Sequence, residues 1–268
     1  MYKQDKQEKI SFKDFLANQG YDIETFKLIK NPPAMNDKWL LHDIKLAIEL
    51  ILQAKKIAVI GDYDTDGITA TTIMVSGLRR IGKDAVFFIP NRFKDGYGLN
   101  VNLVNKSIDC GADLILTVDN GIAAYDAVQH AKDCGLKVIV TDHHNIVKLP
   151  PADAIVHPAM KPYPFANISG CQTAYKLVLA LFEILNIKDE FLERYFLQLS
   201  TLSIISDVMP VASKKMEVNE NRKWLIDGLK SINENPDEHI HALMAAYEFE
   251  RVDETVLGFY VIPCINAV

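Results

Sequence analysis

The sequence lacks the features of a secreted or membrane protein. Its four cysteines, at positions 110, 134, 171 and 264, form no CxxC pair, which argues against a zinc knuckle and against a disulfide framework. No apolar run approaches the roughly 18 residues needed to span a bilayer. The N-terminal stretch MYKQDKQEKISF has no apolar core like that of a signal peptide. We therefore expect a soluble protein of the cytoplasm with no membrane partner.

Excess positive charge is also missing. The chain has 29 Lys and Arg residues against 35 Asp and Glu residues, a formal net charge of -6. This balance argues against a protein that coats nucleic acid by bulk electrostatics, but it permits a local basic or metal-lined groove. By contrast, 49% of the 268 residues are hydrophobic, which is enough for one large core or two small ones.

Short apolar runs alternate with amphipathic segments between residues 43 and 185, a pattern that predicts an α/β fold with a doubly wound parallel sheet. The strands are expected at 57–60, 85–89, 114–118, 138–141 and 154–156. The helices that accompany them are expected at 43–55, 68–81, 101–110, 122–134 and 173–185. A short helix at 12–18 precedes this region, and a helical region follows it, with helices expected at 191–205, 218–232 and 239–247.

The stretch 57–72, IAVIGDYDTDGITATT, places three carboxylates directly after the first expected strand. Asp62, Asp64 and Asp66 would repel one another and raise each other's pKa values, so the cluster favours a bound multivalent cation. The N-terminus of the helix that follows can face a phosphate. The ordinary alternative is an acidic turn that caps this helix.

The ends of later segments carry similar side chains. Asp119 follows the strand at 114–118, Asp142, His143 and His144 follow the strand at 138–141, and Asp207 follows a buried helix. Taken singly, each has an ordinary explanation as a turn former, a loop cap or a helix terminator. The carboxyl ends of parallel strands meet at one edge, so we expect these groups to converge.

Carboxylates with imidazole suit Mn²⁺ or Mg²⁺ better than structural zinc. Two such ions about 3.5–4 Å apart can bind and activate a phosphodiester for hydrolysis. The remaining histidines are treated as structural or solvated; they are His42, His130, His157, His239 and His241.

Four motifs occur in order along the chain: GDYDTDG at 61–67, VDNG at 118–121, TDHH at 141–144 and SDV at 206–208. This ordered set resembles the successive motifs of the DHH phosphoesterase superfamily. NRFKDGYGLN at 91–100 and IPCINA at 262–267 are similar to segments of its RecJ single-strand-specific exonucleases. The resemblance implies a DHH domain at 41–210, after an N-terminal arm at 1–40. Residues 211–268 would be a helical extension toward a second domain.

The resemblance also implies a function. It predicts a metal-dependent enzyme that digests single-stranded DNA from the 5′ end and releases mononucleotides, using two Mn²⁺ or Mg²⁺ ions. Single-strand-binding, replication or repair proteins would be its partners. The chain ends before the second domain, so its grip on long DNA is expected to be weaker than that of longer relatives.

Residue roles follow from the same resemblance. Asp119 would bridge both ions, Asp142 would orient the neighbouring imidazole, and a protonated His144 would face the scissile phosphate. Arg92 would contact DNA through phosphate and Tyr97 by stacking on a base. The expected metal ligands are Asp62, Asp64, Asp66, Asp119, His143 and Asp207, and Asn91 is a further candidate for DNA contact.

The sequence departs from the family pattern at two places. Gln172, within SGCQTAYK at 169–176, stands where the family has a glycine, and it is expected to lie at the substrate and narrow the approach to phosphate. Cys264 stands where the family has an arginine, which would remove one phosphate contact.

Three alternatives stay open at this stage. DTDGIT also resembles the first motif of haloacid-dehalogenase phosphatases, in which Asp64 would be a covalent nucleophile, but this leaves 142–144 unexplained. Oligonucleotide phosphodiesterases, cyclic-dinucleotide phosphodiesterases and pyrophosphatases of the DHH superfamily share the expected metal set. A non-catalytic scaffold associated with replication is the third alternative.

Overall fold

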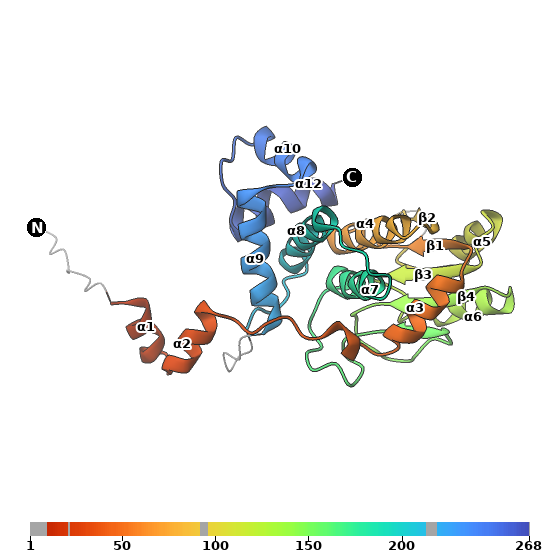
Figure 1. Cartoon of the computed structure of the whole chain (residues 1–268), viewed down its shortest axis with the longest axis horizontal. Helices are drawn as coiled ribbons and strands as arrows, with labels where there is room; N and C mark the ends of the chain where they lie inside the picture. Colours follow the sequence, from red (N-terminus) through yellow and green to blue (C-terminus); the bar gives the residue numbers. More distant parts are fainter. Residues whose placement is uncertain (1–9, 21, 92–95, 213–218, 268) are drawn as a thin grey trace, which may run out of the picture.

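The computed structural model describes residues 10–20, 22–91, 96–212 and 219–267. Its centre is one sheet of five parallel strands in the order β2-β1-β3-β4-β5 (Figure 1). The doubly wound parallel sheet predicted from the sequence is therefore confirmed, and no strand end differs from its expected position by more than one residue. The strands are β1 Lys56–Ile60, β2 Asp84–Phe88, β3 Leu114–Val118, β4 Lys137–Thr141 and β5 Ala154–Val156.

Helices precede, connect and follow the strands. Those before and between the strands are α1 Phe12–Asn18, α2 Ile23–Lys30, the 3₁₀ turn η1 Lys38–Leu40, α3 Ile44–Gln53, α4 Thr65–Arg80, α5 Val101–Asp109 and α6 Tyr125–Asp133. Those after the strands are α7 Gly170–Ile184, α8 Glu190–Ser206, α9 Glu220–Glu234, α10 Glu238–Ala246, α11 Glu254–Val256, the π-helical turn η2 Leu257–Val261 and α12 Ile262–Asn266. The sequence did not predict α2, η1, α11, η2 or α12, because elements this short show too few apolar repeats.

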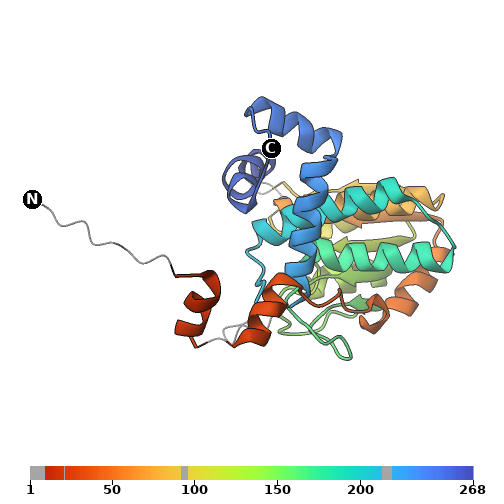
Figure 2. The same cartoon turned by 60° about the vertical axis from the view of Figure 1, so that its left-hand side comes forward.

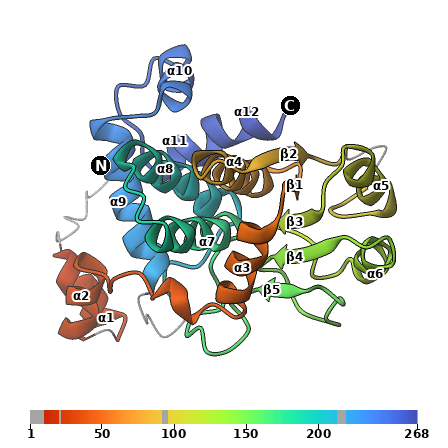
Figure 3. The same ribbon diagram turned by 45° about the vertical axis from the view of Figure 1, so that its right-hand side comes forward.

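Both faces of the sheet are covered, which explains why its strands are apolar without alternation. Ala58, Ile60 and Ile115 lie in the core beneath α5 and α6. Ile57 and Val59 belong to the core on the other face, with α3, α4 and α7 (Figure 3). Successive residues of β1 thus point to opposite faces, and every one from Ile57 to Ile60 is buried.

The C-terminal helices extend the second face. α8 packs against α4 and α7, and α9 crosses α8 on the side away from the strands (Figure 2). The N-terminal arm joins this region where the Arg222 Nε donates to Ile29 O at 2.8 Å. Within the ranges described above, no helix is both long enough and apolar enough to cross a bilayer.

The packing of α4 on α7 depends on a glycine. A Cβ atom on Gly77 would lie 2.5 Å from Val178 Cγ1, so the two helices approach each other more closely than a side chain allows. We expect Gly77→Ala to lower the free energy of unfolding by about 1–2 kcal/mol, because overpacking outweighs the better helix propensity of alanine. Urea denaturation measures this change.

Gly258→Ala is the matched control for that substitution. A Cβ atom there would meet Ile205 Cγ2 at 3.4 Å, which is an ordinary contact, so stability should be unchanged or slightly raised. Equal losses in the two variants would contradict the packing argument.

Candidate metal centre

The first acidic cluster lies between β1 and α4. Asp64 is the N-cap of α4, and its Oδ1 accepts a hydrogen bond from Gly67 N at 2.9 Å. Because this cap satisfies a free backbone donor, the helix begins three residues before the expected position 68. Asp66 therefore sits inside the first turn, and Asp62 stays in the loop, where its Oδ1 accepts from Tyr63 N at 2.8 Å.

The side chain of Asp66 is held by the start of α7. Its Oδ2 accepts from Gly170 N and its Oδ1 accepts from Cys171 N, both at 2.8 Å. The Ser203 hydroxyl donates to Oδ1 as well, at 2.5 Å. The positive end of the α7 dipole thus faces a carboxylate of this protein.

Asp119 follows β3 at the point where the sheet reverses its winding. β1 and β3 are neighbours, while the chain continues from β1 to one edge and from β3 to the other, so their carboxyl ends flank a crevice. Asn120 links the ends of β1 and β3, because its Nδ2 donates to Ile60 O at 3.0 Å and to Val118 O at 2.9 Å. Asp119 itself has a left-handed backbone, with φ of 61°, a conformation that Asp tolerates better than most residues.

Asp142 organises the loop after β4. Its Oδ1 lies 2.7 Å from His144 Nδ1 and accepts from His143 N at 2.7 Å. Its Oδ2 accepts from Ile122 N at 2.8 Å. This bond holds residues 119–124 in a loop, so α6 begins at Tyr125 and not at the expected residue 122. The imidazole that Asp142 orients is therefore that of His144.

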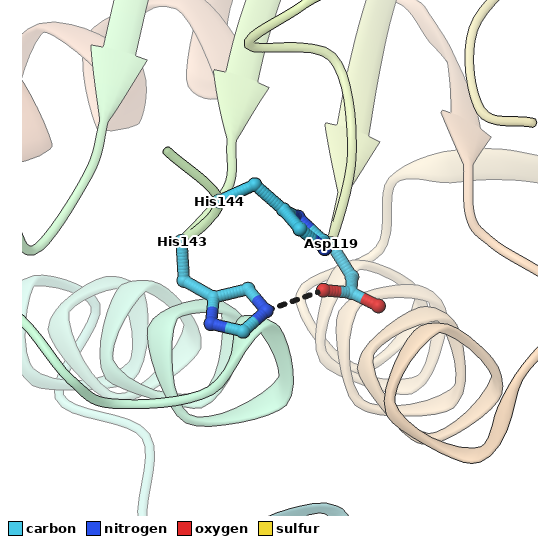
Figure 4. Close-up of side chains that lie close together, drawn as sticks. All are labelled: Asp119, His143 and His144. Atoms are coloured by element: carbon cyan, nitrogen blue, oxygen red, sulfur yellow. Dashed lines mark ion pairs between the residues drawn. The ribbon is translucent and has the colours of Figure 1, made fainter. Parts of the chain in front are cut away.

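The separate clusters meet at His143, whose ring points toward Asp119 (Figure 4). His143 Nε2 lies 3.1 Å from Asp119 Oδ1, 3.4 Å from Asp207 Oδ2 and 3.5 Å from Asp66 Oδ2. Three groups have ligand atoms within 4.8 Å of one another: Asp66, His143 and Asp207; Asp62, Asp64 and Asp119; and Asp119, His143 and His144. The structure thus brings all six expected metal ligands to one crevice.

Two atoms at the centre lack a hydrogen-bond partner. Among the described residues, Asp119 Oδ1 and His143 Nε2 are both buried and make no hydrogen bond, although they lie only 3.1 Å apart. Buried polar atoms almost always form hydrogen bonds. A buried carboxylate oxygen beside a buried imidazole nitrogen, neither of them hydrogen-bonded, therefore indicates a site for a cation. Oxygen and imidazole donors of this kind suit a divalent ion such as Mn²⁺ or Mg²⁺.

Comparison with known proteins identifies the family. Residues 56–204, more than half of the chain, match the N-terminal domain of the DHH family. The chain belongs to the DHH family. This confirms the resemblance seen in the four motifs and removes the haloacid-dehalogenase alternative. The expected domain boundaries near residues 40 and 210 stay predictions.

This DHH chain is similar to proteins named single-stranded-DNA-specific exonuclease RecJ. It is 36% identical to that of Haemophilus influenzae over 247 residues, which cover 85% of this chain and 41% of the relative. It is 36% identical to that of Bacillus subtilis over 265 residues, which cover 94% of this chain and 32% of the relative. The chain thus spans less than half of the length of these relatives.

Solved structures show the same fold. A structure of exonuclease RecJ bound to manganese superposes with a TM-score of 0.74 at 33% identity, over 85% of this chain and 57% of that one. RecJ from Thermus thermophilus in complex with Mn²⁺ superposes with a TM-score of 0.72 at 29% identity, over 88% of this chain and 34% of that one.

The electrostatics of the DHH crevice are those of a site built for positive charge. Burial, then the neighbouring carboxylates of Asp66 and Asp64, raise the pKa of Asp119 well above its usual range. The same causes raise the pKa of Asp207 to about 8, and burial raises that of Asp62 to about 6. Burial also lowers the pKa of His143, which favours the neutral imidazole that a metal needs.

Asp142 and His144 behave differently from that group. The hydrogen bond that His144 donates to Asp142 raises the pKa of His144, so the charged imidazolium is favoured. Burial alone would raise the pKa of Asp142, but the hydrogen bonds from His144 and the backbone hold it below its usual value. The pair therefore places a positive charge beside an acidic crevice.

Tyr97 is exposed at one side of the crevice, beside His144. The Tyr97 hydroxyl lies 3.2 Å from His144 Nε2, and the Tyr97 ring packs edge-on against Tyr63, which sequence reasoning missed. A hollow of about 410 Å³ adjoins them, lined by Tyr97, Gly121, Ile122, Ala123, Asp142, His144 and Asn145. Asn91 is exposed on the same connection, and the expectation for Arg92 lies outside the described residues.

Gln172 is not where the sequence placed it. Its side chain is wholly buried, its Oε1 accepts from Ser169 N at 2.9 Å, and its Nε2 donates to Asn221 Oδ1 at 3.0 Å. Because both ends of the amide are bonded inside the protein, Gln172 does not contact substrate. Cys264 lies on α12, where its Sγ donates to Tyr260 O at 3.1 Å.

Two further side chains support the site without any signal in the local sequence. His157, treated as structural or solvated, is fully buried, and its Nε2 lies 2.9 Å from His144 O. Asn266, in the segment IPCINA, accepts through Oδ1 from Thr65 N at 2.8 Å and from Thr65 Oγ1 at 2.7 Å. The last helix thus contacts the N-terminus of α4, which carries Asp64 and Asp66.

The raised pKa values predict how pH affects the metal-free protein. A carboxyl with a raised pKa keeps its proton when folded at a pH where the unfolded chain has lost it, so its stabilisation exists at low pH and is lost as pH rises. For Asp207 this stabilisation is complete below the usual carboxyl pKa of about 4 and is lost progressively until the pH passes the raised pKa of about 8. Burial of neutral His143 acts in the opposite sense, but that contribution is complete above its usual pKa of about 6.5.

We therefore expect the melting temperature in EDTA to fall from about pH 6.5 to about pH 9 by several degrees, since about 1 kcal/mol corresponds to roughly 2–4 °C at this size. Mn²⁺ or Mg²⁺ should raise the melting temperature, and more so at the higher pH. Asp207→Asn should flatten the fall. A metal-free melting temperature that rises over this range would show that the carboxylates do not repel one another.

Proposed function

We propose that this DHH chain hydrolyses single-stranded DNA from its 5′ end and releases mononucleotides, with two Mn²⁺ or Mg²⁺ ions as cofactors. The observation that carries the proposal is that Asp119 Oδ1 and His143 Nε2 lie buried 3.1 Å apart among acidic side chains and make no hydrogen bond. Support comes from relatives named for single-stranded-DNA-specific exonuclease activity, and from RecJ structures with bound manganese.

The ligand atoms divide into two sets that share a neighbour. Asp62 and Asp64 lie with Asp119 in one set, and Asp66 and Asp207 lie with His143 in the other. Asp119 also lies 3.1 Å from His143, so its carboxylate would help to hold both ions. When bound, such ions stabilise negative charge on a phosphodiester and lower the pKa of water.

His144 supplies the proton on this side of the crevice. Asp142 accepts the Nδ1 proton at 2.7 Å, which leaves Nε2 directed away from Asp142 and toward the Tyr97 hydroxyl at 3.2 Å. A protonated His144 would donate from Nε2 to a phosphate oxygen or to the leaving group. No nucleophilic side chain is needed.

Tyr97 is the side chain best placed to contact a base. It is 52% exposed, and it stands at the hollow beside His144, where stacking of its ring would hold a nucleotide next to the crevice. DNA contacts by Asn91 and Arg92, recruitment by single-strand-binding or repair proteins, and a cytoplasmic location stay predictions.

The test uses the whole chain with end-labelled oligonucleotides. In the presence of Mn²⁺, single-stranded DNA with a 5′ phosphate should yield labelled mononucleotides, and the same sequence as a duplex should be resistant. Asp119→Asn keeps the shape and tolerates the left-handed backbone, and it should lower turnover by more than about 100-fold. Asp133→Asn, on the exposed end of α6, is the matched control and should leave turnover unchanged.

Two results would contradict this assignment. Preferential cleavage of dinucleotides, cyclic dinucleotides or pyrophosphate would show that the chain acts on a different substrate from single-stranded DNA, as other members of the superfamily do. Full turnover in Asp119→Asn would remove the bridging role, and no hydrolysis of any of these substrates would favour a scaffold.

A further inference from the structure

A buried amide outside the metal-binding crevice connects the segments that carry its ligands. Asn221 lies in the first turn of α9, beyond the family match at 56–204, and its side chain is fully buried. Its Nδ2 donates to Asn167 O at 2.7 Å and to Pro210 O at 3.0 Å. Its Oδ1 accepts from Gln172 Nε2 at 3.0 Å. One side chain therefore joins the loop before α7, the start of α7 and the loop after α8.

The first connection leads to Asp66 through a chain of donors. Gln172 and Ser169 form a reciprocal capping box at the start of α7. The Ser169 hydroxyl is hydrogen-bonded to that of Ser203, which donates to Asp66 Oδ1 at 2.5 Å. Because the first amides of α7 also bind Asp66, any shift of this helix start moves the carboxylate.

The second connection leads to Asp207. Pro210 is three residues beyond it, and its carbonyl accepts from Asn219 Nδ2 at 2.8 Å as well as from Asn221. Between them Val208 has a left-handed backbone, with φ of 51°, which is strained for a β-branched residue. The turn that carries Asp207 is therefore held from outside, by the first residues of α9.

We propose that Asn221 is a positioning residue for the metal centre, which sets the separation of Asp66 on α4 from Asp207 after α8. These two carboxylates share His143 as their neighbour, with Nε2 at 3.5 Å and 3.4 Å. The inference rests on the proposed metal-dependent function. Residues that orient ligands without touching the metal typically change metal affinity by about 10–100-fold.

The experiment compares Mn²⁺ affinity in two variants that lose equivalent buried amides. Gln198 is the matched control because it is fully buried and also makes three bonds, to Ser231 Oγ, Asn235 O and Asp237 N. These bonds join α8 to α9 and α10 and do not reach Asp66 or Pro210. Asn221→Ala and Gln198→Ala should both lower the melting temperature in EDTA.

Of these two variants, only Asn221→Ala should weaken Mn²⁺ binding, by roughly tenfold or more. The affinity is measured on the whole chain by electron paramagnetic resonance of free Mn²⁺. Gln172→Ala should weaken Mn²⁺ binding in the same direction, and the double variant should lose less than the sum because both act through one bond. Gln172→Ala also serves if Asn221→Ala does not fold.

The outcomes separate the two proposals. Wild-type Mn²⁺ affinity in Asn221→Ala, or in Gln172→Ala when the other is unfolded, would overturn the positioning role alone. An equal loss in Gln198→Ala would also overturn it, since general destabilisation would then explain the effect. A wild-type chain that binds no Mn²⁺ would overturn the metal centre itself, and this inference with it.

Discussion

Repulsion among buried carboxylates is the constraint around which this protein is built. Asp66 and Asp119 are almost inaccessible to solvent, and with Asp207 they surround a single imidazole within 3.5 Å. Without a cation, such a group lowers the stability of the fold at neutral pH, as the raised pKa values of Asp119 and Asp207 show. The surrounding structure must therefore hold the group rigidly enough that a cation finds it already assembled.

The acidic side chains divide into two kinds according to what their oxygens bind. Asp64 and Asp142 accept from backbone amides or from a neighbouring imidazole, so they shape the loops that carry them. Asp119 keeps a buried oxygen that accepts no hydrogen bond from any described residue. Asp66 belongs to both kinds. Its oxygens accept hydrogen bonds from the first amides of α7, and they also lie near His143 and Asp207. Asp142 thus only supports the site, whereas Asp64 and Asp66 both shape the structure around it and belong to the proposed ligand sets.

A second feature is that much of the support comes from segments outside the sheet. Asn266 from the last helix holds Thr65, and His157 after β5 holds the main chain of His144. Gly170 can approach Asp119 only because it has no side chain, since a Cβ atom there would lie 2.3 Å from Asp119 Oδ1. The helical region therefore completes a site whose expected ligands lie mostly just beyond the carboxyl ends of the strands.

The sequence alone determined the strands, the parallel sheet and the set of acidic and imidazole side chains, because apolar runs and the residues that end them are local features. It also placed Asp66, Asp119 and His143 at one edge, since parallel strands end together. Only the tertiary structure shows that Gln172 is buried and hydrogen-bonded inside the protein. It also shows that His157, Asn221 and Asn266 form hydrogen bonds to the segments that carry the site. The hydrogen-bond partners that join His157, Asn221 and Asn266 to the site lie between 11 and 201 residues away in the chain, so no local pattern of composition or spacing records them.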